Sequence, residues 1–97
     1  MIDVIVSDNC QHCESQLDIM RKSFFEDEYR IVKESSEAFI SHEYKNNIVG
    51  FPYIIVKDDE DGNIMYASVG VHDGTALRKI QRRGSVGAFN LSKAKSG

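Results

Sequence analysis

The chain is built of segments in which apolar residues recur with one of two periods. The first segment, Ile2–Val6, is rich in β-branched residues and predicts a buried strand of a sheet that is covered on both faces. In the next segment the apolar residues recur every three or four positions. They are Cys13, Leu17, Met20 and Phe24. This spacing predicts an amphipathic helix from Cys10 to about Phe25.

A second strand and a second helix are predicted to follow. Residues 29–33 contain adjacent β-branched residues and predict a short strand. Ser35 or Ser36 then offers a helix cap, and residues 37–46 predict a helix. We expect His42 at the surface of this helix. The aromatic residues that we expect in the core are Phe24, Phe25 and Phe39.

The next part of the chain predicts a hairpin. Pro52 opens the apolar run 53–56, and proline is tolerated at the first residue of a strand. The polar segment 58–63 contains an Asp-Gly step, which is typical of a hairpin turn. Residues 64–69 then predict the return strand.

A last helix completes the order β-α-β-α-β-β-α. Asp73 or Thr75 can cap it, Leu77 and Ile80 are expected to face inward, and Gly84 is a typical helix stop. The first two strands flank a helix and should be parallel, with a right-handed crossover. We therefore expect an α/β fold with a four-stranded mixed sheet flanked by three helices. This domain spans residues 1–84, and residues 85–97 form a flexible basic tail.

Length and composition indicate one small globular domain. The chain has 97 residues, of which 41% are hydrophobic and 28% are charged. No apolar run approaches the roughly 18 residues that span a bilayer. The first residues lack the basic n-region of a signal peptide. We expect a cytoplasmic monomer without a membrane segment.

The net charge of −3 is unevenly distributed. All 15 acidic residues lie in residues 1–77, together with six of the 12 basic residues, and the other six basic residues lie in residues 78–97. A basic end can contact nucleic acid or an acidic partner. It is also typical of a solvated helix end with a loose tail, whose apolar residues here are Phe89 and Leu91. We favour the second interpretation and do not expect nucleic-acid binding.

Both cysteines lie in the motif Cys10-Gln11-His12-Cys13, after the first strand and at the start of the first helix. A structural zinc site needs four Cys or His ligands, and the usual paired spacing is missing, so we expect no metal. Residues three apart on a helix share one face, which brings two sulfurs within disulfide range. In a reducing compartment such a pair indicates redox chemistry. The alternative is that both are small core residues.

The helix start gives the two cysteines different expected roles. Free N–H groups and a partial positive charge at a helix N-terminus stabilise a thiolate. Such sites lower a cysteine pKa from about 8.5 to between roughly 3.5 and 7.5. Cys10, at the N-terminus of the helix, is the expected nucleophile, and Cys13, on the apolar face of the helix, is the expected resolving thiol. Protonated His12 would stabilise the Cys10 thiolate, whereas Asp8 would oppose it.

Three motifs together resemble the glutaredoxin and thioredoxin family, in particular the small dithiol glutaredoxins of bacteria and their viruses. They are Cys10-Gln11-His12-Cys13, Val49-Gly50-Phe51-Pro52 and Gly70-Val71-His72-Asp73. The resemblance covers residues 2–83 and implies a thioredoxin-like fold and thiol–disulfide oxidoreductase activity. Gln11-His12 departs from the family's usual Pro-Tyr, and no Trp precedes Cys10 as it does in thioredoxins.

The resemblance also implies roles for the loops. Pro52 would be cis and face the cysteines, the backbone of Phe51 would pair with the substrate, and Gln11 would contact it. The loop that would hold the terminal carboxylate of glutathione consists of Gly70, Val71, His72 and Asp73. Asp73 would cap the helix or take the amino group of the ligand, and the alternative is a plain capping loop. Glutathione or a thioredoxin reductase would supply electrons, no other cofactor is implied, and the clients would be disulfide-containing proteins such as ribonucleotide reductase.

Two other functions are compatible with these residues. Some glutaredoxins bridge a [2Fe–2S] cluster across a dimer through the first cysteine and glutathione. A thioredoxin-like domain can also serve as a non-enzymatic interaction module of a larger assembly. The basic end of the chain, with Phe89 and Leu91, motivates this second alternative.

Overall fold

The computed structural model describes residues 1–82 of the chain. Its strands and helices are β1 (Ile2–Val6), α1 (Gln11–Ser23), β2 (Tyr29–Lys33), α2 (Glu37–Ile40), β3 (Tyr53–Lys57), β4 (Ile64–Val69) and a last helix over residues 74–82. Short 3₁₀ turns cover Glu26–Glu28 and Lys45–Asn47. The predicted helix stop at Gly84 and the predicted tail, residues 85–97, lie outside the described residues. Within residues 1–82, no helix has the length and apolar character needed to cross a membrane.

The strands form one four-stranded mixed sheet in the order β2-β1-β3-β4. β1 and β2 are parallel, whereas β3 is antiparallel to both of its neighbours, β1 and β4. The predicted mixed α/β architecture, with a four-stranded sheet and three helices, is confirmed, as are the parallel first pair and the final hairpin. The spatial order of the strands comes from the structure alone.

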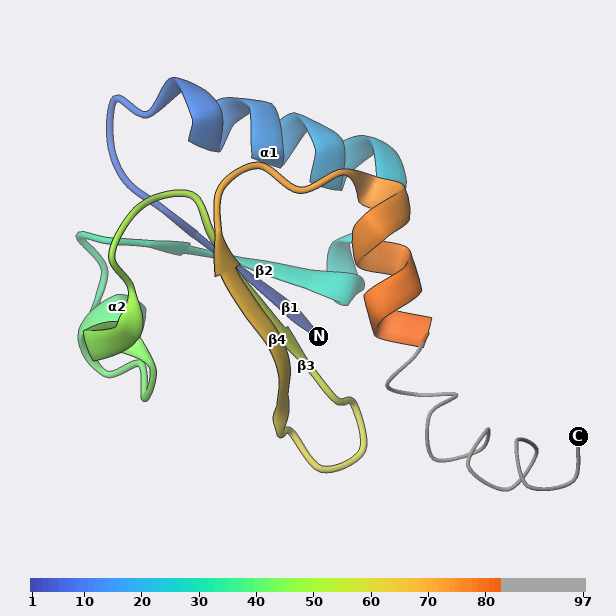
Figure 1. Cartoon of the computed structure of the whole chain (residues 1–97). Coiled ribbons are helices and arrows are strands. Elements are labelled where there is room, and N and C mark those ends of the chain that lie inside the picture. The colour runs from blue at the N-terminus through green and yellow to red at the C-terminus, as the bar shows by residue number, and fades with distance from the viewer. Residues whose placement is uncertain (83–97) are drawn as a thin grey trace, which may run out of the picture.

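One face of the sheet packs against α1 and the helix over residues 74–82 (Figure 1). Alternate residues of a strand face the same side, so every second residue of β1 contributes to this core. The buried residues are Ile2, Val4, Val6, Cys13, Met20, Phe24, Ile54, Val56 and Leu77. Both helices are therefore held by apolar contacts to the two central strands.

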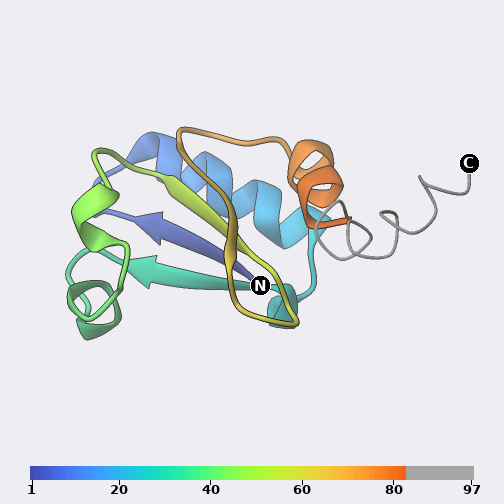
Figure 2. The ribbon, with the colours of Figure 1, turned by 60° about the horizontal axis from the view of Figure 1, so that its bottom comes forward.

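The other face of the sheet is covered by the segment that runs from α2 to the start of β3 (Figure 2). The strand residues buried on this face are Ile5, Val32, Tyr53 and Ile55. Phe39 packs against them half-buried, and its ring centroid lies 6.3 Å from that of Phe51. Burial raises the pKa of Tyr53, and the neighbouring Tyr44 adds to this shift.

The second helix is shorter than predicted, and His42 is buried instead of exposed. α2 ends at Ile40, and His42 is only 8% exposed. In a continuing helix, the N–H of Tyr44 would donate to the carbonyl of Ile40. It donates instead to Nδ1 of His42, at 3.1 Å. The ring of His42 turns inward because it has a partner in the sheet.

That partner is Asp3, a β1 residue that is 1% exposed. The Nε2 atom of His42 lies 2.9 Å from Oδ2 of Asp3, while Nδ1 accepts from Tyr44, so the neutral ring carries its proton on Nε2. Arg30 donates to the same carboxylate at 3.0 Å, and Nζ of Lys57 lies 3.4 Å away. Burial alone raises the pKa of Asp3, but the bonds from His42 and Arg30 and the charge of Lys57 outweigh it, so the pKa lies below its ordinary value.

Phe25 was expected in the core and is 78% exposed. Phe24, the C-cap of α1, is 7% exposed, with the guanidinium of Arg78 at 4.4 Å from its ring centroid. Both phenylalanines have extended backbones, and successive side chains of an extended chain point to opposite sides. Because Phe24 points inward, Phe25 points outward.

We predict that Asp3→Asn lowers the free energy of unfolding by about 2 kcal/mol at pH 7, because the buried charge that Arg30 and Lys57 approach is lost. The folded protein lowers the pKa of Asp3 from 3.8, so this stability is present above pH 3.8 and is lost as the pH falls through the lower folded-state pKa. Denaturant titrations from pH 7 to pH 2 should show the difference from the wild type shrinking below about pH 4.

The control is Asp18→Asn, since Asp18 forms an exposed ion pair with Lys22 and should change stability little. A difference between the wild type and Asp3→Asn that stays the same down to pH 2 would contradict the assignment of this stability to the Asp3 charge.

Candidate functional site

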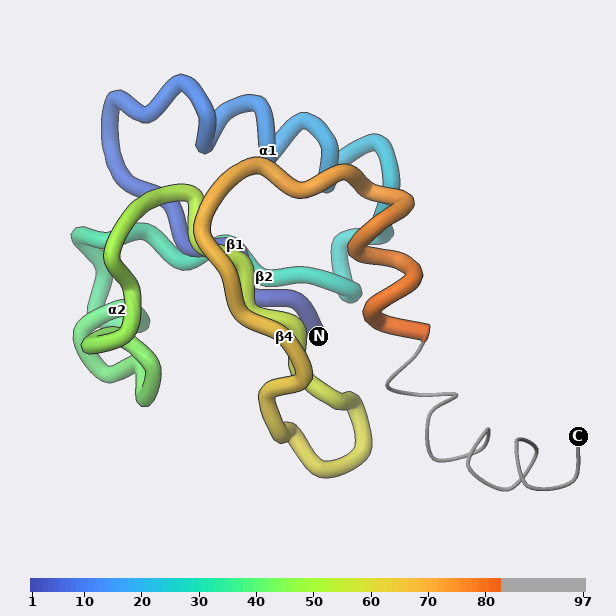
Figure 3. The backbone as a smooth tube through the Cα atoms, in the orientation of Figure 1, coloured from blue at the N-terminus to red at the C-terminus, as the bar shows by residue number. Residues whose placement is uncertain are grey.

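The three motif segments meet at one edge of the sheet. Antiparallel pairing brings the end of β1 next to the start of β3, and the start of β3 next to the end of β4. Ile5 pairs with Tyr53, Tyr53 pairs with Val69, and the N–H of Gly70 donates to the carbonyl of Pro52 at 2.8 Å. Figure 3 traces the orange loop after β4 as it passes beside α1. The segments 7–13, 48–52 and 70–73 therefore form one site.

A sharp turn leads from β1 into α1. Asn9 has φ 54°, in the left-handed region that asparagine tolerates better than most residues. The extended residue Cys10 follows as the N-cap of α1. Its Sγ accepts a hydrogen bond from the backbone N–H of Cys13 at 3.1 Å. A sulfur atom thus takes the position that a serine or aspartate oxygen usually takes at a helix start.

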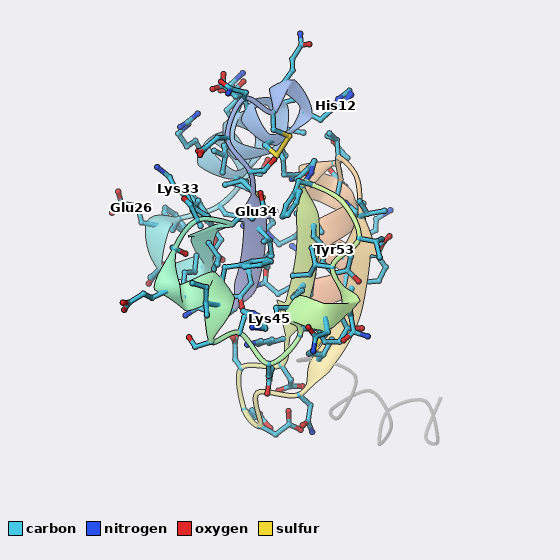
Figure 4. The ribbon with its side chains drawn as sticks, turned by 90° about the vertical axis from the view of Figure 1, so that its left-hand side faces the viewer. His12, Glu26, Lys33, Glu34, Lys45 and Tyr53 are labelled. Atoms are coloured by element: carbon cyan, nitrogen blue, oxygen red, sulfur yellow. A yellow bond between two sulfur atoms is a disulfide. The ribbon has the colours of Figure 1, made fainter. Side chains whose placement is uncertain are left out.

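Cys10 and Cys13 form a disulfide, with their Cα atoms 5.1 Å apart. The two residues differ in exposure: Cys13 is 2% exposed within the core, whereas Cys10 is half-buried at its margin. Figure 4 shows the yellow disulfide at the end of the molecule where His12 lies. Gln11 and His12 are both exposed in the first turn of α1, beside the disulfide. This asymmetry leaves Cys10 as the residue that a partner reaches first.

The Phe51–Pro52 peptide bond is cis, as the resemblance implied. Pro52 is buried, and Phe51 is half-buried at the junction of the two cores, with contacts to both. Cys10 packs against one of these same cores. The start of β3 therefore lies at the same edge as the disulfide, with Phe51 between the two faces of the sheet.

Gln16, which lies outside the three motifs, connects α1 to the loop after β4. Its side chain is 0% exposed. Its Oε1 accepts from the backbone N–H of His72, and its Nε2 donates to the carbonyl of His72 at 3.0 Å. The signal in the sequence was a polar residue on the apolar face of a helix, between Cys13 and Met20. Such a residue needs a buried partner.

The His72 ring is half-buried and is held by hydrogen bonds within the chain. Its Nδ1 lies 2.8 Å from the carbonyl oxygen of Gly70, which can only accept, so Nδ1 carries the proton. Nε2 of the neutral ring then accepts from the hydroxyl of Tyr66 at 2.8 Å. The two rings also meet edge to face, with centroids 5.5 Å apart. Both ring nitrogens of His72 therefore have partners within the chain.

Asp73 caps the helix over residues 74–82. Its Oδ2 accepts from the N–H of Thr75 at 3.1 Å, and its carbonyl accepts from the N–H of Leu77. Leu77 is fully buried, as predicted. Val71, the remaining residue of the loop, is 44% exposed. The side chains of His72 and Asp73 form hydrogen bonds within the chain, whereas the apolar side chain of Val71 is exposed to a partner.

The described residues contain no group of three or more His, Cys, Asp or Glu side chains arranged to hold a metal ion. Comparison of the chain with protein-family models and with curated proteins finds no match. The class of site is therefore defined by its own geometry: a disulfide with CxxC spacing at the first turn of a helix, in a small mixed α/β protein.

We predict that Gln16→Leu destabilises the loop after β4, because the backbone N–H and C=O of His72 lose their partner. The expected loss in the free energy of unfolding is about 2 kcal/mol. Amide hydrogen exchange at His72 should accelerate more than exchange in β1. Ser15→Ala, which removes an exposed hydroxyl next to Gln16, is the control and should change neither quantity. Unchanged protection of the His72 amide in Gln16→Leu would contradict the prediction.

Proposed function

We propose that this protein is a dithiol thiol–disulfide oxidoreductase with a thioredoxin-like fold, of the glutaredoxin type that its motifs resemble. The observation that carries the proposal is the Cys10–Cys13 disulfide at the N-terminus of α1, with one cysteine half-buried and the other 2% exposed. The pairing of β3 with β1 and β4 and the hydrogen bond from Gly70 to Pro52 add support, because they bring the three motifs to one edge.

The helix start favours a reactive thiolate at Cys10. The backbone N–H of Cys13 points at the Cys10 sulfur, and the partial positive charge of α1 acts at the same place. Both interactions are stronger with a negatively charged sulfur than with a neutral one. The buried Cys13 lacks direct access to a large substrate, so its role is intramolecular.

The proposed reaction is a pair of thiol–disulfide exchanges. The Cys10 thiolate attacks one sulfur of a substrate disulfide, so a Cys10–substrate bond forms and the other substrate thiolate leaves and takes a proton. Cys13, deprotonated to solvent, then attacks the Cys10 sulfur, forms the intramolecular disulfide and releases the first substrate thiol. The substrate gains two electrons and two protons: the protein supplies both electrons and, through solvent, the proton of Cys13, and solvent supplies the other proton. A donor thiol pair reverses these exchanges and restores the dithiol.

The proposal includes two classes of thiol donor, glutathione and a protein dithiol such as that of a reductase. Clients would be proteins that carry a disulfide accessible to Cys10. His12, exposed in the first turn, would tune the Cys10 thiolate, and Phe51 with Pro52 would contact the client backbone.

We predict that the reduced protein reduces a peptide disulfide in a single turnover, while forming the Cys10–Cys13 disulfide. Cys10→Ser should abolish the reaction, because the residue that a partner reaches first is gone. Cys13→Ser should stop after the first exchange and accumulate a mixed disulfide on Cys10, since the resolving thiol is missing. Rapid acid quench followed by mass spectrometry measures each species.

His42→Asn is a suitable control, because it changes a buried residue that belongs to the Asp3 cluster and not to the site. It should preserve the two-step reaction. Equal rates for Cys10→Ser and the wild type, or a mixed disulfide that forms on Cys13 in preference to Cys10, would contradict the proposed roles.

A further inference from the structure

The surface around the disulfide is acidic. We call the segments 7–14, 48–52 and 69–73 the rim, since they meet at the edge where Cys10 lies. Within the rim, the carboxylate side chains are Asp8, Glu14 and Asp73, and none of its residues is Lys or Arg. Further along the same edge, β2 ends at Lys33, and Glu34 follows it directly, so this pair adds no net charge (Figure 4).

The rim also carries exposed apolar side chains. Val49 is 85% exposed, Val69 is 46% exposed and Val71 is 44% exposed. A methyl group on Gly50 would lie 3.1 Å from Cγ2 of Val69, so the backbone beside Val49 lies directly against the end of β4. Val69 is the last residue of β4, and Val49 and Val71 lie in the loops before β3 and after β4, so all three present branched apolar side chains at the rim.

Three hydrogen-bond donors in and directly after the loop that follows β4 are already used within the protein. The N–H of His72 donates to Gln16, and the N–H of Thr75 donates to Asp73. The Nδ1–H of His72 donates to the carbonyl of Gly70. A free carboxylate placed here would therefore meet the carboxylate of Asp73 and occupied donors, without a lysine or arginine of the rim to compensate it.

We propose that the substrate of this site is a polypeptide disulfide whose cysteine is flanked by apolar and basic residues, and that glutathione disulfide is a poor substrate. This inference rests on the proposed oxidoreductase function. Apolar neighbours of the substrate cysteine cover the three valines, and basic neighbours face the acids of the rim. Glutathione is anionic and has no branched apolar side chain, so it fits neither feature. For the same reasons, a protein dithiol fits this site better than glutathione as the thiol donor that reduces the Cys10–Cys13 disulfide.

The test compares three disulfides in single turnovers of the reduced wild-type protein. They are glutathione disulfide, the disulfide dimer of acetyl-Lys-Val-Cys-Val-amide, and the dimer of acetyl-Glu-Val-Cys-Val-amide. The basic peptide should react fastest and glutathione disulfide slowest. Raising the ionic strength should slow the basic peptide and accelerate glutathione disulfide, because salt screens the attraction of one and the repulsion of the other.

Two variants test the apolar part of the rim. Val49→Ser and Val71→Ser should each lower the second-order rate constant for the basic peptide about fivefold, and leave that for glutathione disulfide unchanged. Phe25→Ser is the matched control. It removes an apolar side chain about as exposed as that of Val49, located beyond the far end of α1, and should change neither rate constant.

The outcomes separate this inference from the proposed function. If glutathione disulfide reacts as fast as the basic peptide, or if both valine variants slow all three disulfides equally, the substrate assignment is wrong and the oxidoreductase function stands. If none of the three disulfides oxidises the reduced protein, the oxidoreductase function itself fails, and the substrate assignment fails with it.

Discussion

The antiparallel pairing of β1 with β3 is the constraint on which the site depends. It sets the end of β1, where the chain turns at Asn9 into α1, beside the start of β3. The pairing of β3 with β4 then brings Gly70 against Pro52, with a hydrogen bond of 2.8 Å. Three motifs far apart in sequence thereby share one edge. A change of register by one residue would turn Asp3 of β1 away from Arg30 and His42 and toward the apolar core under α1, so core packing maintains this arrangement.

Helix α1 turns that arrangement into a chemically asymmetric disulfide. Its apolar stripe buries Cys13 in the core, while the N-cap position leaves Cys10 at the margin. Gln16, on the same buried stripe, bonds to both backbone groups of His72 and fixes the loop after β4 against the helix. The packing that stabilises the fold therefore also holds the rim around the sulfurs.

Periodicity was sufficient to predict the strands, α1, the hairpin and the inward position of Leu77, because each has a regular apolar pattern. It failed where a single polar contact decided the structure. Asp3 looked like a lone acid in an apolar run, and His42 looked like a surface residue, yet they bond to each other and end α2 early. The pattern also could not show which of Phe24 and Phe25 is buried. That depends on the extended backbone after α1, which turns Phe25 outward.

The proposed reactivity of Cys10 depends on a thiolate stabilised by the N-terminus of α1, and the pH dependence of alkylation tests this most directly. Reduced protein is treated with iodoacetamide across pH 4 to pH 10, and each cysteine is quantified by peptide mass spectrometry. We predict that Cys10 alone is modified in the folded protein, with half-maximal rate below about pH 7.5. A half-maximal rate at about pH 8.5 or above, or equal modification of Cys13, would contradict the account.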